Sequence, residues 1–193
     1  MVQLTKLVAA AAVAAFALIN TAETLQRRLS AETVLGTSHK SNLSGVSLLT
    51  TPSAIFGGNV KCILEPQVTE GPYYVNGELI RQDIRERQRG VDLFTEIQII
   101  DDGLVTFLTT FPGHYTGRAH HIHVLSTHNG TVLANKTYAG GMASHVGQIF
   151  FDQDLITEVE ATPDYVVNTQ PLTTNAQDSI FQESAVSGFD PVV

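Results

Sequence analysis

The chain has few basic residues, one cysteine and only one long apolar run. Lysine and arginine account for 11 of its 193 residues, against 19 aspartates and glutamates, and the net charge is -8. No basic face is therefore available to neutralise phosphates, which argues against a nucleic-acid partner. The chain also lacks an internal repeat and a glycine-rich phosphate loop. With 43% hydrophobic residues, it is long enough for one domain with a sizeable core.

The single long apolar run lies in residues 1–22, which have the pattern of a secretory signal peptide. Lys6 precedes an unbroken apolar stretch at 7–19, and the tripeptide Asn-Thr-Ala at 20–22 offers small residues for cleavage. The stretch is too short to span a bilayer comfortably. We therefore predict a secreted, extracellular protein without a membrane segment in its mature form.

Two further features bear on secretion. Triplets that can accept N-linked glycans begin at Asn42, Asn129 and Asn135, which agrees with an extracellular glycoprotein. The single cysteine, Cys62, is unusual for this class of protein. It indicates a missing partner, a bridge to a second chain or a buried free thiol.

Beyond the signal peptide, the pattern divides the chain into an arm and one domain. We expect residues 23–55 to form an irregular, poorly packed N-terminal arm, partly helical around 31–35, and residues 56–193 to form the domain. Runs rich in β-branched and aromatic residues, separated by turn signals, predict strands at 93–100, 104–111, 120–126, 131–133 and 146–151. A short helix is expected at 152–161, followed by a polar tail that either wraps the domain or is disordered. This pattern predicts an all-β sandwich.

Candidate functional residues are concentrated at 111–124, with the sequence FPGHYTGRAHHIHV. His121 and His123 are two positions apart, so on a strand they project from the same face and can hold one metal ion. Tyr115 offers a phenolate oxygen, a hard anionic donor that favours ferric iron over zinc. Arg118 adds a fixed positive charge for an anionic substrate or intermediate. A His-x-His pair alone is equally common as a surface or cross-strand pair, and it is the added tyrosine and arginine that favour a metal site.

Five motifs, in order along the chain, resemble the intradiol ring-cleavage dioxygenases, in particular their secreted fungal subgroup. They are CILEPQVTEGPYYV at 62–75, ELIRQDI at 78–84, GVDLFTEIQIID at 90–101, FPGHYTGRAHHIHV at 111–124 and GQIFFDQDL at 147–155. The resemblance covers most of the chain from about residue 38 onward. It implies a β-sandwich that holds non-haem Fe(III) and opens small aromatic diols of the catechol type between their two hydroxyl-bearing carbons, inserting both atoms of O2.

The resemblance also implies a ligand set. Tyr115 matches the tyrosine of the family's P-x-x-Y motif, and His121 and His123 match the two imidazole ligands of R-x-x-H-x-H. In the family, this tyrosine is the ligand that leaves the iron when substrate binds, and its phenolate can accept a proton from the catechol.

Three further residues take their implied roles from the same resemblance. Arg118 matches the arginine that stabilises negative charge on the substrate ring, and Gln148 matches the glutamine that supports the site from a later strand. Tyr74 is expected, from its position alone, to line the substrate cavity.

The chain departs from the family pattern near residues 101–102. The family's second tyrosine ligand, in a G-x-Y-S-G type motif, has no counterpart, because the strand ending IQIID is followed directly by the one beginning DGLVTF. The absent segment also carries a core strand and the cysteine expected to pair with Cys62, so the lone cysteine agrees with an internal deletion. We therefore expect an incomplete sandwich, weak iron binding and low or no activity.

Several alternatives follow from this departure. The chain is either the product of a mis-spliced or mispredicted gene or a natural deletion, in which residues 102–103 close a new hairpin. The alternative function is a secreted, non-catalytic β-sandwich module that binds aromatic or carbohydrate ligands. A cupin-like metal site, which also uses His-x-His, is disfavoured because residues 126–131 supply no glutamate.

Overall fold

The computed structural model describes residues 31–40, 44–45, 50–51, 54, 68–69, 77–99, 103–185 and 189–193. The predicted signal peptide, Asn42, Cys62, Tyr74 and residues 101–102 lie outside these ranges. The elements are β1 Asp92–Ile99, β2 Gly103–Thr110, β3 His121–His128, β4 Thr131–Val132, β5 Tyr138–Ala139, β6 Met142–Phe150, α3 Gln153–Glu160, the 3-10 helix η1 Asn175–Gln177 and α4 Ser179–Ser184. Among the described residues, no helix is long and apolar enough to cross a membrane.

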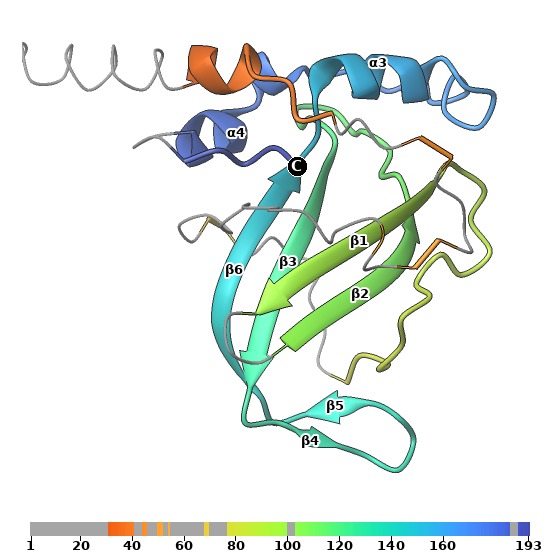
Figure 1. Cartoon of the computed structure of the whole chain (residues 1–193), viewed down its shortest axis with the longest axis vertical. Helices are drawn as coiled ribbons and strands as arrows, with labels where there is room; N and C mark the ends of the chain where they lie inside the picture. The colour runs from red at the N-terminus through yellow and green to blue at the C-terminus, as the bar shows by residue number, and fades with distance from the viewer. Residues whose placement is uncertain are drawn as a thin grey trace, which may run out of the picture.

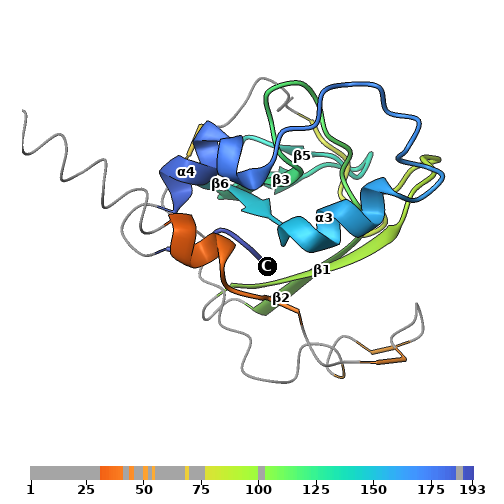
Figure 2. The ribbon, with the colours of Figure 1, turned by 90° about the horizontal axis from the view of Figure 1, so that it is seen from above.

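Two antiparallel ribbons form the β-rich body of the fold. β1 pairs with β2 from Asp92↔Thr110 to Ile99↔Gly103, and β3 pairs with β6 from His121↔Phe150 onward. Figures 1 and 2 show the two ribbons as separate layers, with the small β4–β5 hairpin at one end. In the described part of the chain each layer contains two strands. The prediction of a β-rich fold is therefore confirmed at this coarse level.

A cavity of about 560 Å³ lies between the two ribbons. Its walls are mostly apolar side chains, including Ile97 and Phe107 from the first ribbon and Ile122 and Val124 from the second. His123 is also among the residues that line it. The space between the layers therefore extends to the strand that carries the candidate metal ligands.

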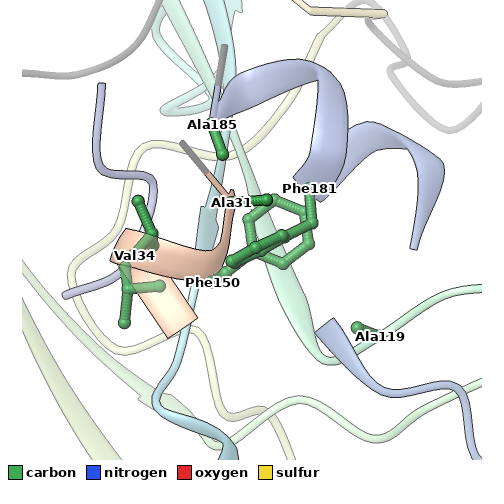
Figure 3. Packing of buried hydrophobic residues seen from close by; sticks show 7 residues of the cluster. Ala31, Val34, Ala119, Phe150, Phe181 and Ala185 are labelled. Carbon is green, nitrogen blue, oxygen red and sulfur yellow. The ribbon is translucent and has the colours of Figure 1, made fainter. Parts of the chain in front are cut away.

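The β3–β6 ribbon is covered by a different apolar cluster on each face. On the face of Phe150, the cluster brings together residues of the arm, the segment before β3, β6 and the C-terminal tail (Figure 3), namely Ala31, Val34, Ala119, Phe150, Phe181, Ala185 and Val192. On the opposite face, residues from α3 and from the segments that follow β2, β6 and α3 pack together, namely Phe111, Phe151, Ile156, Val159 and Tyr165. Side chains in extended chain alternate between two faces, so Phe150 at the end of β6 and Phe151 just after it enter different clusters.

The N-terminal arm is better packed than we expected. Residues 31–35 are helical, as predicted, but Ala31 and Val34 are 2% and 6% exposed and contact the aromatic cluster beside α4. Residues three apart lie on the same side of a helix, so the short helix presents both side chains to Phe150 and Phe181. The expectation of a poorly packed arm is therefore wrong for this stretch.

The C-terminal tail wraps the domain rather than being disordered. It contains η1 and α4, and its end follows β6, where the Phe150 amide donates to the Pro191 carbonyl at 2.9 Å. His39 joins this tail to the arm, with Nδ1 2.7 Å from Asp152 and Nε2 2.8 Å from Asp190. The arm, the start of α3 and the chain end are thus held together by one imidazole.

Candidate metal centre

A tight turn places Tyr115 beside Arg118. The Arg118 amide donates to the Tyr115 carbonyl at 3.1 Å, and Gly117 has a φ of 84°. This left-handed backbone conformation is strained for residues with a Cβ and is freely adopted by glycine. The sequence Tyr-Thr-Gly-Arg therefore folds back just before β3 and brings the phenol close to the strand that carries the histidines.

The two imidazoles and the phenol converge on one point. Nε2 of His121 lies 3.2 Å from Nε2 of His123 and 3.5 Å from the hydroxyl oxygen of Tyr115. Nδ1 of His121 lies 2.6 Å from the Ala119 carbonyl, which can only accept a hydrogen bond. Nδ1 therefore carries the proton, and the lone pair of Nε2 is directed at the group, as in metal-bound histidines.

The surroundings keep both imidazoles neutral. Burial lowers the pKa of His121 to about 4, and the nearby positive charge of Arg118 acts in the same direction. Burial also lowers the pKa of His123, again with a contribution from Arg118. Neutral imidazole is the form that binds metals, so this site needs little deprotonation before it can accept a cation.

Arg118 is held beside this group by two side chains. Gln148 lies directly opposite His123 in the β3–β6 register and is 2% exposed. Its Oε1 accepts from Nη2 of Arg118 at 2.5 Å. Nε of Arg118 donates to Oδ2 of Asp178 at 2.8 Å. The guanidinium is thus fixed by a residue of β6 and by a buried carboxylate at the start of α4.

A second group lies on the other side of the same segment. Nδ1 of His114 and Nε2 of His120 lie 2.8 and 2.7 Å from Oε1 of Glu160, at the end of α3. The candidate ligand atoms of the three side chains lie within 4.8 Å of one another, so this group also could hold a metal ion. Nε2 of His114 donates to the Gln170 carbonyl at 2.9 Å.

Contacts next to the second group also hold the turn between Tyr115 and Arg118 in place. Asn168 donates from Nδ2 to the His114 carbonyl at 2.9 Å, and Thr116 donates from its hydroxyl to Oε1 of Gln170 at 2.7 Å. Together with Glu160, these contacts tie the segment before β3 to α3 and to the loop that follows it. The even-numbered histidines therefore anchor the segment, while the odd-numbered residues form the candidate metal centre.

The structure brings together five of the six residues that the sequence singles out. Tyr115, His121 and His123 converge, and Arg118 and Gln148 are bonded to each other next to them. Tyr74 lies outside the described residues.

Two acidic residues of the site were missed by the sequence analysis. Asp178 begins α4 and accepts from the amides of Ile180 and Phe181; a helix start at an aspartate before SIFQES is a signal that could have been found. Glu160 gave no comparable signal, because its partners are 40 and 46 positions away.

Comparisons with known proteins place this geometry within one fold. No protein-family model matches the chain, and no curated protein matches it. An intradiol ring-cleavage dioxygenase from Tetranychus urticae is similar in structure, with 23% identity and a TM-score of 0.53, over 68% of this chain and 85% of the other. A second solved dioxygenase is similar at 24% identity and a TM-score of 0.52, with the same coverage. The chain therefore has the fold of the intradiol ring-cleavage dioxygenases.

Proposed function

We propose that the chain is a non-haem Fe(III) intradiol dioxygenase that acts on catechol-type aromatic diols with O2, with turnover reduced by the absence of a second tyrosine ligand. The observation that carries the proposal is the convergence of the Tyr115 hydroxyl with Nε2 of His121 and His123. The shared fold with a protein described as an intradiol ring-cleavage dioxygenase supports the same reaction class.

The donor set suits ferric iron. Two neutral nitrogens and one phenolate oxygen form a mixed set, in which the hard anionic oxygen favours Fe(III). Tyr115 is 40% exposed, so its phenol can move away from the imidazoles without disrupting the core. His121 and Gln148, by contrast, are buried and form the rigid side of the site.

Different residues of this chain would accept the substrate proton and stabilise the negative charge on the substrate. Bound Fe(III) would supply the chemistry that makes a catecholate reactive toward O2. The phenolate of Tyr115 would take a proton from a catechol hydroxyl as it turns toward solvent. Arg118 would stabilise negative charge on the ring oxygen, and Gln148 would keep the guanidinium in position.

The positions of the described tyrosines favour a second candidate function, that of a binding module without catalysis. The hydroxyl of Tyr138 accepts from the Gly130 amide, and that of Tyr165 donates to the Phe111 carbonyl. Among the described tyrosines, only Tyr115 is therefore at the candidate centre. A three-ligand site beside an apolar cavity can bind an aromatic molecule without completing the reaction.

We also propose that the protein acts outside the cell as a glycoprotein. The described acceptor Asn135 is in the β4–β5 turn, where its side chain is exposed and accepts from the Thr137 hydroxyl. Asn129 follows β3 in another exposed turn. Both positions are accessible to a glycosylating enzyme, which supports the secretion expected from residues 1–22.

The experiment that tests the proposed function is oxygen labelling of the product. Protein loaded with Fe(III) is incubated with catechol or hydroxyquinol under ¹⁸O₂, and the ring-opened diacid is analysed by mass spectrometry. We expect slow formation of a product with two labelled atoms. Tight binding of the diol with no labelled product would instead support the non-catalytic module.

Matched variants identify the group that binds the metal. His123→Ala should weaken Fe(III) binding by more than about tenfold, while Glu160→Gln, in the second group, should leave it within about twofold. His128→Gln, at the far exposed end of β3, is the control. The reverse result would move the metal to His114, His120 and Glu160.

A further inference from the structure

We propose that Asp178 is a positioning residue, which holds the guanidinium of Arg118 against the Tyr115, His121 and His123 group. This inference rests on the proposed function, because it assigns Asp178 to the arginine that would stabilise the anionic substrate. It implies that α4, a helix from the C-terminal tail, helps to position a residue of the site.

The carboxylate of Asp178 is fixed from both sides. Its Oδ1 accepts from the amides of Ile180 and Phe181 at 2.8 and 3.1 Å, and its Oδ2 accepts from the Ala119 amide at 2.7 Å. The side chain is fully buried. Because α4 and the segment before β3 both bind it, the carboxylate has one orientation, and Oδ2 is held where Arg118 can reach it.

Arg118 is the charge that balances this carboxylate. Its Nε donates to Oδ2 of Asp178 at 2.8 Å, and the arginine side chain is 17% exposed. A buried carboxylate without a cationic partner is strongly unfavourable. The pair therefore keeps the guanidinium at this place, whereas an unpaired arginine side chain would extend into water.

Among the described residues, one nitrogen of Arg118 is not engaged by a side chain or a carbonyl. Nε is bonded to Asp178 and Nη2 to Gln148, while Nη1 has no hydrogen-bond partner among the described residues. Two anchors define the plane of a guanidinium, so its third nitrogen also has a fixed direction. The predicted ligand for Nη1 is an anionic oxygen, such as that of a catecholate.

A capping role alone would predict something different. Asp178 is the N-cap of α4, and the loss of such a cap lowers stability without acting on Arg118. Asp178→Asn separates the two roles. The side-chain oxygen of asparagine can still cap α4, but its NH2 group then faces Nε of Arg118 and the Ala119 amide, which are themselves hydrogen-bond donors. Phe181→Leu is the matched control, since it loosens the core beside α4 and leaves the carboxylate in place.

The first readout needs no metal. In ¹⁵N NMR spectra, the Nε–H signal of Arg118, assigned by its absence from Arg118→Lys, should be resolved and exchange slowly with water. It should merge with the signals of exposed arginines in Asp178→Asn and persist in Phe181→Leu. A rapidly exchanging signal in the unmodified protein, or an unchanged one in Asp178→Asn, would overturn the proposal.

The second readout measures binding of 4-nitrocatechol to the Fe(III)-loaded protein. We expect affinity to fall about tenfold in Asp178→Asn and in Arg118→Lys, and the double variant to be no weaker than Arg118→Lys alone. Additive losses would contradict the positioning role. Should Asp178→Asn fail to fold, Asp178→Ser provides the same comparison, because serine also caps helices but is too short to reach Arg118.

The two readouts separate the inference from the proposed function. Failure of the protein to bind Fe(III) would refute the proposed function, while the NMR result would still decide how Arg118 is held. Binding of 4-nitrocatechol that is unaffected by Asp178→Asn would refute the inference and leave the proposed function intact.

Discussion

His120 and Glu160 form a largely buried contact, with Nε2 of the imidazole 2.7 Å from Oε1 of the carboxylate. The His120 side chain has no exposed surface, and the Glu160 side chain is 16% exposed. Because the same carboxylate oxygen also contacts His114, one residue of α3 holds both ends of the segment that carries Tyr115 and Arg118.

Replacement of Glu160 should therefore destabilise the fold. Glu160→Ala leaves two buried imidazole nitrogens without a partner, and we expect the free energy of unfolding in urea to fall by about 2–4 kcal/mol. The control is Glu158→Ala in the same helix, where an exposed carboxylate lies 3.4 Å from Lys40 and the loss should be below about 0.5 kcal/mol. Equal losses in the two variants would show that the Glu160 contacts contribute no specific stability.

The stability that the N-terminal arm contributes should depend on pH through the protonation of His39. Burial alone would lower the pKa of His39, but its bonds to Asp152 and Asp190 outweigh this and raise it above 6.5. The stabilisation is therefore complete below pH 6.5 and is lost as the pH rises through the raised value.

Urea unfolding of the unmodified protein and of His39→Gln tests this. The difference in unfolding free energy should be largest in mild acid and should shrink as the solution becomes alkaline. A difference that grows with pH would contradict the assignment of a protonated imidazole between the two carboxylates.

His121 should change the stability of the fold with pH in the opposite direction to His39. Burial lowers its pKa to about 4 in the folded state, against 6.5 for an ordinary histidine. Between these values the unfolded chain binds the proton and the folded chain does not, so stability falls as the pH drops from 6.5 toward 4. We expect this loss to be on the order of 2 kcal/mol, allowing for screening by solvent.

The measurement is the slope of unfolding free energy against pH in metal-free protein. His121→Asn should flatten the slope below pH 6.5, whereas His128→Gln, at the exposed end of the same strand, should leave it unchanged. An unaltered slope in His121→Asn would mean that this imidazole is not buried in the neutral form.

Much of the fold was predictable because its signals are local. Alternating β-branched residues predicted β1 and β2, and the run at 146–151 falls at the end of β6, although β6 begins earlier, at Met142. The helix predicted at 152–161 is found as α3. By contrast, the packing of Ala31 and of Phe181 in α4 depends on Phe150, which is distant in sequence from both.

The same division applies to the candidate centre. Tyr115, Arg118, His121 and His123 lie within nine positions, so strand alternation for the histidines and the nearness of the other two residues in sequence were enough to predict a shared site. Asp178 is 60 positions from Arg118, and no pattern in the sequence relates the two. Their contact arises only when the tail folds back over β6.

The most direct test of the account is the visible spectrum of the protein titrated with Fe(III). We predict a tyrosinate-to-iron absorption band that saturates at one iron per chain and is removed by a competing chelator, as expected for three ligands. The band should vanish in Tyr115→Phe and persist in Tyr138→Phe, whose hydroxyl bonds to the Gly130 amide away from the centre. A band that survives Tyr115→Phe, or no band at any iron concentration, would contradict the claim that Tyr115, His121 and His123 bind one ferric ion.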